Sequence, residues 1–271
     1  YMGFEVIDKS HIFAPKRFFP QCHASTVLAL NDGEVLAAWF GGTHENDADV
    51  AIWCSRKKNG RWFDPLKVAD KSGVACWNPV LHSGSNGRLT LYYKVGINPR
   101  KWYTMAAESS DNGHTWSEPR ELIKGDIGGR GPVKNKAITL LDNTILAPAS
   151  IETDTAWDAF VDISKDEGIS WIKSERIPLD RKNLNGKGII QPTLWESQPN
   201  HVHMLLRSTE GAIYRSDSLN GGKTWCEAYP TGLPNNNSGI DVAKTENGKL
   251  VLVYNPVEGD WAERTPIVCA I

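Results

Sequence analysis

A short phrase that ends in tryptophan returns along this chain at a nearly fixed interval. Its clearest copies occupy residues 109–116, 164–171 and 218–225, and a degraded copy occupies residues 55–62. The closing residues lie 54 or 55 positions apart: Trp62, Trp116, Trp171 and Trp225. A constant period of about 50 residues is typical of supersecondary units that stack on their neighbours. The fold must therefore be built from such units.

Each copy has the residues of a tight turn. In the copy at 109–116, Asp111 can accept hydrogen bonds from the backbone that follows it, and Gly113 can adopt a positive φ without a Cβ clash. Thr115 and Trp116 then begin a strand, where β-branched and aromatic residues pack well. The third copy replaces the aspartate by Asn220. We interpret the phrase as a hairpin turn anchored by its tryptophan, with a structural and not a catalytic role.

Between the copies, short apolar runs alternate with turns, which is typical of antiparallel hairpins. The turns carry Asn, Asp or Gly: Asn31-Asp32-Gly33, Asn86-Gly87 and Asp142-Asn143. Strands are predicted at 24–30, 35–40 and 50–54; at 80–81, 89–93 and 103–107; at 137–141, 145–149 and 160–163; and at 240–243, 250–255 and 266–271. Units of four strands repeated radially indicate an all-β fold, the β-propeller. We expect no amphipathic helix longer than a turn or two.

The spacing of the units suggests an incomplete ring. A fifth unit begins near Ser238, and its turn phrase would start just past Ile271. Because an open propeller exposes a sheet edge, we expect that the chain is a single domain over 1–271 that lacks its last blade. The run at 4–7 is expected to supply a strand to that missing blade.

Composition excludes several classes of function. Lys and Arg number 30 against 32 Asp and Glu, for a formal net charge of −2, so no nucleic-acid or membrane surface is expected. No apolar run approaches the roughly 18 residues of a membrane span. The chain has no nucleotide fingerprint, phosphate loop or metal motif, so we expect neither cofactor nor metal. Five cysteines form no CxxC motif and are expected as buried free thiols: Cys22, Cys54, Cys76, Cys226 and Cys269.

Two short patterns carry little weight on their own. His201 and His203 alternate along one face of a predicted strand, and a surface strand explains them. Asn236-Asn237-Ser238 matches the acceptor pattern for N-glycosylation, which is too short to weigh.

Polar residues stand early in the innermost strands, where a propeller core would favour Val or Ile. These positions line the central channel: His23, Asn78, Lys134, Lys136, Gln191 and Asp241. A buried polar group without a partner costs roughly 1–3 kcal/mol. The side chains must therefore either satisfy one another or face a wet cavity and a polar ligand, and we favour the ligand site.

Further candidates flank this ring. Five lie at or just past the second strands: Lys94, Glu152, Arg207, Asn255 and Arg264. The loop 41–49 is long for a strand connection and rich in acids, as rim loops that carry function often are, although a merely solvated loop is an alternative. Because Arg207 directly follows an apolar run, its guanidinium needs a carboxylate partner from the protein or from a ligand.

The turn phrases resemble the Asp-box (BNR) repeats of the sialidase superfamily, six-bladed propellers that cleave terminal sialic acids. Other Asp-box proteins only bind. The resemblance extends over nearly the whole chain and implies a sialidase-type β-propeller, with six blades in the complete protein and about five here. The chain is also similar to the branch known as predicted neuraminidases, in the segments 22–26, 40–42, 77–79, 134–136, 190–192, 206–208 and 237–241.

The resemblance also implies roles for single residues. Sialidases bind the sugar carboxylate through three arginines, which suit bidentate binding. Arg207 and Arg264 match the second and third, whereas His23 stands where the first belongs. Gln191 stands where the family has the glutamate that activates its nucleophilic tyrosine, and that tyrosine would lie beyond this chain. The acid/base aspartate would come from the rim loop, which offers three candidates: Glu45, Asp47 and Asp49.

Three functions agree with these residues. The first is a sialidase-like glycoside hydrolase that acts on a terminal anionic sugar, sialic or uronic, although glutamine at position 191 cannot support the retaining route through an activated tyrosine. The second is a polysaccharide lyase or uronic-acid hydrolase that uses His23 as acid or base. The third is a non-catalytic glycan-binding propeller. In each case the partner is an anionic oligosaccharide or glycoconjugate, while the sugar, the compartment and the oligomeric state stay open.

Overall fold

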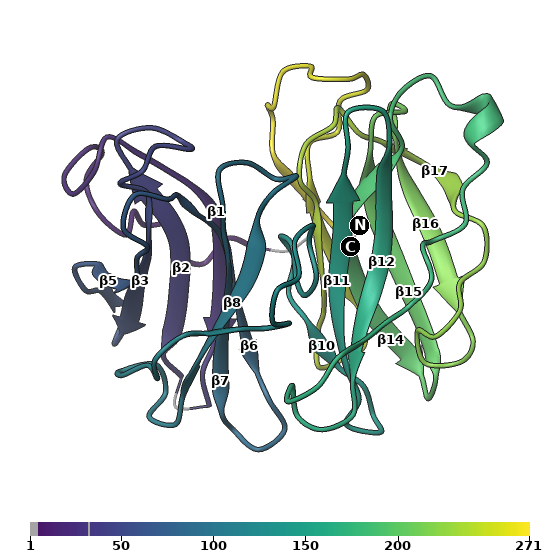
Figure 1. Cartoon of the computed structure of the whole chain (residues 1–271). Helices are drawn as coiled ribbons and strands as arrows, with labels where there is room; N and C mark the ends of the chain where they lie inside the picture. The colour runs from purple at the N-terminus through teal and green to yellow at the C-terminus, as the bar shows by residue number, and fades with distance from the viewer. Residues whose placement is uncertain (1–4, 32) are drawn as a thin grey trace.

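The computed structural model describes residues 5–31 and 33–271, and its strands form five antiparallel sheets, the blades of a β-propeller (Figure 1). Blade one contains β1 (Gln21–Ala29), β2 (Val35–Gly42), β3 (Ala51–Lys58), β4 (Arg61–Trp62) and β5 (Leu66–Ala69). Blade two contains β6 (Cys76–Ser83), β7 (Leu89–Val95), β8 (Tyr103–Ser109) and β9 (Arg120–Glu121). Blade three contains β10 (Ile138–Thr139), β11 (Ile145–Glu152), β12 (Trp157–Ser164) and β13 (Ile172–Lys173).

Blade four contains β14 (Ile189–Gln198), β15 (His201–Ser208), β16 (Ala212–Ser218) and β17 (Tyr229–Pro234). Blade five contains β18 (Asp241–Lys244), β19 (Leu250–Tyr254) and β20 (Val268–Ala270). In the described part of the chain the one helix is the 3₁₀ turn η1 (Arg181–Asn183). Strands pair in chain order within each blade, except that β5 of blade one pairs with β3. The all-β propeller predicted from the repeat is confirmed.

The turn phrase forms a hydrogen-bonded box. Ser109 Oγ donates to Asp111 Oδ1 at 2.7 Å, and Asp111 accepts from the Thr115 amide at 2.9 Å and the Thr115 hydroxyl at 2.6 Å. Gly113 has a φ of 80°, and a Cβ there would lie 2.8 Å from Leu36 Cδ2 in blade one. The copy at 164–171 repeats these bonds. In the copy at 218–225, Asn220 Oδ1 accepts from Ser218 and from the Thr224 amide, while Asn220 Nδ2 donates to the Thr224 hydroxyl. The box therefore closes a hairpin and packs each blade against the preceding one.

The copy at 55–62 is built differently. Asn59 and Gly60, with φ of 49° and 77°, make a two-residue turn from β3 into β4, as expected for a tight hairpin. Lys57 stands where Asp111 stands in the box. Because this copy lacks the aspartate, it keeps the turn and the tryptophan but not the box hydrogen bonds.

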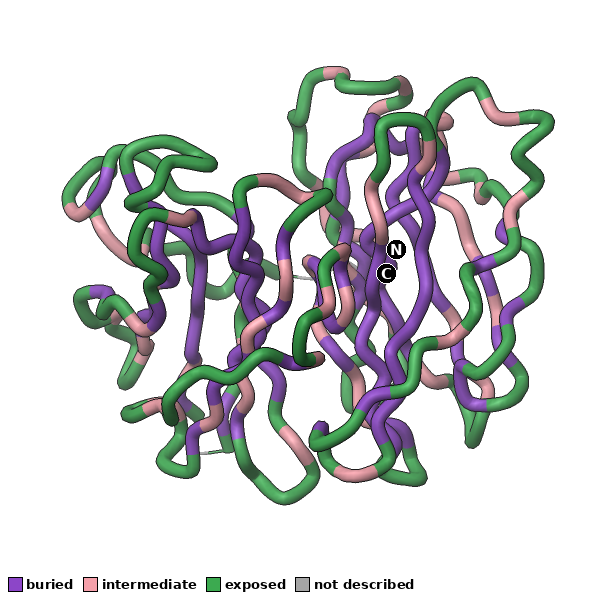
Figure 2. Tube along the Cα trace, viewed as in Figure 1, coloured by how far each residue is buried: buried purple, intermediate pink, exposed green. Residues whose placement is uncertain are grey.

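The apolar core lies between successive blades. Four clusters fill the four interfaces, and Figure 2 shows their buried strands between exposed turns. The box tryptophans belong to this packing: Trp116 packs against the cluster between blades one and two, Trp171 lies between blades two and three, and Trp225 lies between blades three and four. The repeat thus sets both the turn and the spacing between blades.

Side chains near the channel also join neighbouring blades. Asn78 Nδ2 donates to the Val133 carbonyl at 2.9 Å, and Asn135 Nδ2 donates to the Gln191 carbonyl at 2.9 Å. Each bond connects the start of one inner strand to the next unit. The positions of the inner strands are therefore fixed relative to one another where the candidate site lies.

Some predicted elements differ in the structure. Residues 5–7 are exposed and pair with no strand here, so the strand predicted at 4–7 for a further blade stays a prediction. Phe4 and the turn residue Asp32 lie outside the described residues. The strand predicted at 137–141 is reduced to β10, and the one at 266–271 to β20. Ahead of β1, Phe13 and Phe19 pack on Trp39 at the outer face of blade one. No helix in the described part of the chain is long and apolar enough to cross a membrane.

Candidate functional site

Three inner strands share a backbone irregularity near their first residues. The pairing register of β1, β6 and β14 shifts there, and Ala24, Asn78 and Gln191 adopt positive φ values of 53°, 40° and 52°. Bulges of this kind re-aim side chains, and left-handed residues other than glycine persist only where the surroundings hold them. The bulges therefore set the direction of the side chains at this end of the channel.

Arg207, on β15, is the best-oriented cation of the site. Its Nε donates to Asn237 Oδ1 at 2.7 Å, and its Nη1 donates to Gln191 Oε1 at 3.0 Å. The guanidinium lies 5.7 Å from the ring centres of both Trp157 and Trp261. Both hydrogen-bond acceptors are neutral amides, and no carboxylate forms an ion pair with it in the described ranges. Arg207 is thus oriented while its positive charge stays available, although burial lowers its pKa to about 10.

Two further cations accompany Arg207. Arg264 is exposed and lies 5.4 Å from the ring centre of Trp261. Burial lowers the pKa of Lys134, the favourable charge of Asp241 opposes that shift, and neighbouring cations, among them Arg207, reinforce it. The charge of Arg207 acts on Lys134 and the charge of Arg264 acts on Arg207, so the three cations can attract an anion together.

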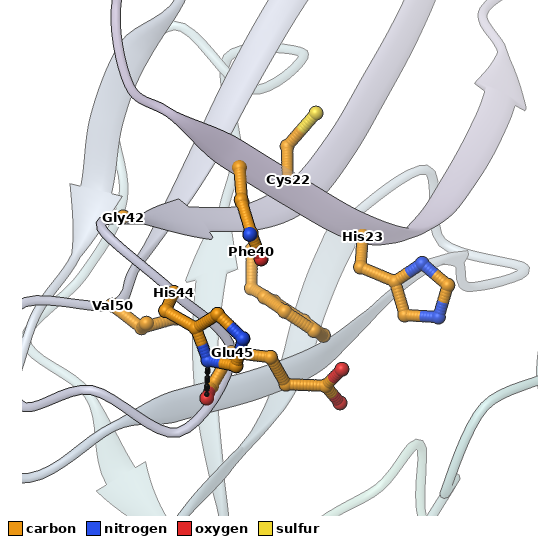
Figure 3. Close-up of a pocket in the computed structure, with 8 residues that line it drawn as sticks. Cys22, His23, Phe40, Gly42, His44, Glu45 and Val50 are labelled. Carbon is orange, nitrogen blue, oxygen red and sulfur yellow. Dashed lines mark hydrogen bonds between the residues drawn. The ribbon is translucent and has the colours of Figure 1, made fainter.

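His23 and Glu45 face the same space. They line a pocket of about 130 Å³ together with Phe40 and His44, and Figure 3 shows the Glu45 carboxylate and the His23 imidazole directed to one side of it. Burial is the largest cause that lowers the pKa of His23, and the Glu45 carboxylate opposes that shift. Three cations reinforce the lowering: Arg264, Lys134 and Arg207. The imidazole of His23 in blade one is therefore within electrostatic range of Arg207, Arg264 and Lys134.

The acids of the rim loop are not equivalent. Asp49 accepts hydrogen bonds from the backbone and the hydroxyl of Thr43 at 3.0 and 2.8 Å, so it shapes the loop. Asp47 lies in an exposed turn and lines no part of the pocket. Of the three loop acids, Glu45 is the one that lines the pocket with His23.

Several predicted ligands have structural contacts instead. Lys94 is fully buried, and its Nζ donates to Thr104 Oγ1 at 2.6 Å and to the Arg130 carbonyl at 2.7 Å, so its prediction as a substrate contact is wrong. Asn78 joins two blades, as described above, and Asn255 Nδ2 donates to the Pro266 carbonyl at 2.9 Å. The sequence pattern could not show that the side-chain amides of Asn78 and Asn255 donate to backbone carbonyls.

The remaining candidates lie at the edge of the cluster. Lys136 and Asp241 form an ion pair at 2.8 Å, and Asp241 also accepts from Thr193 Oγ1. These two residues therefore satisfy each other. Burial raises the pKa of Glu152, at the end of β11, and the positive charge of Arg207 opposes that rise. The charges of Glu152 and Asp260 oppose the lowering of the Arg207 pKa, although neither acid forms an ion pair with the guanidinium in the described residues.

The sequence analysis missed the aromatic and amide residues that hold the arginines. Trp261 is 64% exposed, and Asn237 is fully buried with its Nδ2 donating to Asp260 Oδ1 at 2.6 Å. Asn236 Nδ2 donates to the Glu263 carbonyl at 2.6 Å and so fixes the loop that carries Arg264. In the sequence these asparagines belong to a glycosylation pattern, and Asn237 also to the segment 237–241 that resembles the predicted neuraminidases, but neither pattern indicated that both side chains are completely buried.

No cluster of metal-ligating side chains occurs in residues 5–31 and 33–271. All five cysteines are free, but only two are buried as expected, Cys54 and Cys76, with burial raising the pKa of each to about 12. Cys22 and Cys226 are exposed, which corrects the prediction of buried thiols for them.

Comparison with known proteins supports the architecture. The BNR repeat-like domain matches residues 33–271, and no curated protein sequence matches the chain. A crystal structure of a protein of unknown function from Dyadobacter fermentans is 16% identical with a TM-score of 0.71, covering 88% of this chain and 77% of its own.

Two sialidases have similar folds. The NanB sialidase from Streptococcus pneumoniae is 13% identical with a TM-score of 0.71 over 94% of this chain, and the Trypanosoma rangeli sialidase in complex with sialic acid is 16% identical with a TM-score of 0.69 over 93%. This chain spans 59% and 46% of those two chains. At these identities the likeness concerns the fold.

Proposed function

Because this chain belongs to the BNR repeat-like domain family, we propose that it is a sialidase-like glycoside hydrolase that acts on a terminal anionic sugar. One observation carries the proposal: two neutral amides orient Arg207 without neutralising it, beside Arg264 and Lys134. A guanidinium with free donors binds a carboxylate through paired hydrogen bonds. A sugar acid, sialic or uronic, supplies that carboxylate.

The hydrogen-bond partners of Arg207 differ from those of an arginine in a structural ion pair. Elsewhere in the chain, the half-buried Arg130 bonds to the carboxylate of Asp162 at 2.7 Å. Arg207 is buried but has amide partners. A buried charge without an opposite charge as partner is costly. An anionic ligand that pairs with Arg207 would therefore gain more binding free energy than a surface ion pair provides.

His23 and Glu45 provide the proton chemistry. Cleaving a glycosidic bond requires a proton for the leaving oxygen and activation of the attacking group. An imidazole and a carboxyl that face one pocket can hold one proton between them and deliver it to that oxygen. In this proposal Gln191 has no role as a base, since an amide cannot accept the proton, and it orients Arg207 instead.

A lyase is the second candidate, favoured by the environment of His23. Its lowered pKa keeps the imidazole neutral, as a base requires, and cations surround it. Lysine and arginine beside a uronate carboxylate would acidify the C5 proton, which His23 would then remove. A uronic-acid hydrolase would use the same groups on the same class of sugar.

The test assays the full-length protein on fluorogenic sialosides, fluorogenic glucuronides and uronate polysaccharides. Release of the fluorophore supports the hydrolase, and His23→Gln and Glu45→Gln should each reduce it. Ultraviolet absorbance of an unsaturated uronate, without fluorophore release, would support the lyase and contradict the hydrolase. Saturable binding of a sugar acid that yields no product from any substrate would contradict both enzymes and leave a glycan-binding propeller.

A further inference from the structure

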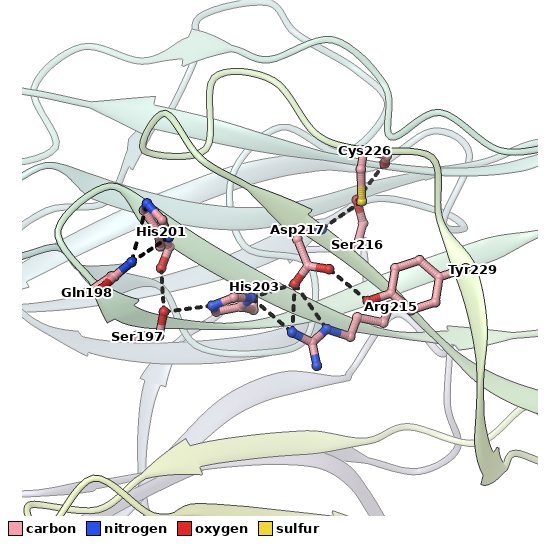
Figure 4. Close-up of polar contacts among 9 residues, drawn as sticks. All are labelled: Ser197, Gln198, His201, His203, Arg215, Ser216, Asp217, Cys226 and Tyr229. Atoms are coloured by element: carbon pink, nitrogen blue, oxygen red, sulfur yellow. Dashed lines mark hydrogen bonds and ion pairs between the residues drawn. The ribbon is translucent and has the colours of Figure 1, made fainter.

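A second cluster of reactive side chains lies on blade four, away from the carbohydrate site. Ser197 Oγ is 2.8 Å from His203 Nε2, and His203 Nδ1 is 2.5 Å from Asp217 Oδ1. Figure 4 shows the imidazole between the hydroxyl and the carboxylate. The three residues come from β14, β15 and β16. This is the order of contacts in a Ser-His-Asp triad, which is recognised by geometry rather than by sequence position.

The hydrogen bonds fix the tautomer of His203. His203 Nδ1 lies 2.5 Å from Asp217 Oδ1 and 3.1 Å from Arg215 Nη2, which itself donates to Asp217 Oδ1 at 2.9 Å. A carboxylate can only accept a hydrogen bond, so the closer contact places the Nδ1 proton toward Asp217. In the neutral ring Nε2 then has a lone pair, and Ser197 donates its hydroxyl proton to it. The other contact of Ser197, with the His201 carbonyl, is longer at 3.4 Å. His203 is therefore placed to take the proton of the serine.

Neighbouring residues hold the imidazole and the carboxylate in place. Trp195 stacks on His203 with ring centres 5.1 Å apart and planes 23° apart. Tyr229 donates its hydroxyl to Asp217 Oδ2 at 2.8 Å, and Arg215 Nε donates to Oδ1 at 3.0 Å. Such oriented partners keep a base in the rotamer that reaches its nucleophile. Ser197 itself is exposed at the end of β14 and is open to an approaching molecule.

We propose that Ser197 is an activated nucleophile that accepts an acyl group from a small ester. Its Oγ attacks the ester carbonyl as its proton passes to His203 Nε2. The bond to the alcohol oxygen then breaks, and that oxygen leaves with the proton from His203. Water, deprotonated by the same nitrogen, hydrolyses the acyl-serine and releases the acid. Because the serine lies on an open strand end, esters with good leaving groups are the substrates to expect, rather than amides.

This site is separate from the proposed carbohydrate site. Gln191 and Ser197 lie on the same strand, and six residues of extended chain span about 20 Å. The proposal therefore does not rest on the sugar chemistry at Arg207. Glycosidase or lyase activity should survive the loss of Ser197.

The experiment treats the full-length native protein with a fluorophosphonate probe and locates the adduct by peptide mass spectrometry. We expect labelling at Ser197 that is absent in Ser197→Ala and in heat-denatured protein. Asp217→Asn should slow labelling by about 10⁴-fold, the loss of kcat that the same change causes in a serine protease triad. Ser110→Ala removes an exposed serine that has no imidazole contact in the described structure, and it should label like the native protein.

Three outcomes would overturn the proposal. These are no adduct on the native protein, equal labelling of Ser197→Ala, or labelling that Asp217→Asn leaves unchanged. The last would mean that the carboxylate has only a structural role. Thermal unfolding of each variant confirms that it is folded, and hydrolysis of an aryl acetate by the native protein, lost in Ser197→Ala, gives a second readout.

Discussion

Replacing Gln191 by glutamate would put a negative charge on Arg207 with almost no change in shape. The amide oxygen lies 3.0 Å from Arg207 Nη1, where a carboxylate would be attracted by about 5 kcal/mol at an effective dielectric constant of about 20. A ligand carboxylate bound at the same guanidinium would lie about 6 Å from the new charge, with a repulsion of about 3 kcal/mol. Gln191→Glu should therefore weaken binding of a sugar acid about a hundredfold.

Isothermal titration with a sialic or uronic acid measures this change directly. Gln191→Met is the matched control, since it removes the acceptor without adding a charge and should weaken binding less. Asn237→Asp places a carboxylate on the Nε side of the same guanidinium, so it should act like Gln191→Glu. Unchanged or tighter binding by Gln191→Glu would refute the idea that Arg207 is kept uncompensated for an anionic ligand.

Three further results are expected. Burial lowers the pKa of His23, and the Glu45 carboxylate opposes that shift. The acid limb of the pH–rate profile should therefore lie below the usual histidine range, and it should move to still lower pH in Glu45→Gln. A limb that moves to higher pH would contradict the interaction between His23 and Glu45. Burial lowers the pKa of Lys94 from 10.5 to about 7, so the unfolded chain binds more protons in this range, and the free energy of unfolding should rise with pH from about 7 to 10.5 by up to about 1.4 kcal/mol per unit. Urea unfolding of Lys94→Met should show a flatter rise, and an identical slope would exclude this lysine as its source. The hydroxyl and amide of Thr115 hold the pKa of Asp111 well below its usual range, so Asp111→Ala should lower the melting temperature more than Asp111→Asn, and equal losses would argue against the box hydrogen bonds.

The fold could be predicted from the sequence because its information is local. The box at 109–116 carries its own hydrogen bonds, and Trp116, Trp171 and Trp225 mark the blade spacing without reference to distant residues. The residues at which strands end could not be predicted from local sequence alone. The extension of β11 to Glu152 depends on its pairing with β12 across a turn that has no clear signal.

The site could be predicted only in part, because its geometry is not local. The candidates His23, Arg207 and Arg264 came from the repeat spacing and the family resemblance, and in the structure the charges of both arginines act on the His23 imidazole. Lys94 was misplaced because β7 turns its side chain to the interior, where Thr104 and a backbone carbonyl receive it. Trp261 was missed because a lone tryptophan in a loop does not reveal which arginine it will contact.

The central claim is that Arg207, Arg264 and Lys134 recognise a carboxylate. The most direct measurement is the affinity of the full-length protein for a sugar acid compared with the methyl ester of the same sugar, which has the same shape but no charge. We predict that the ester binds at least about a hundredfold more weakly, a difference of about 3 kcal/mol, and that Arg207→Met removes this discrimination. Equal affinity for acid and ester would contradict the proposed recognition of an anionic sugar.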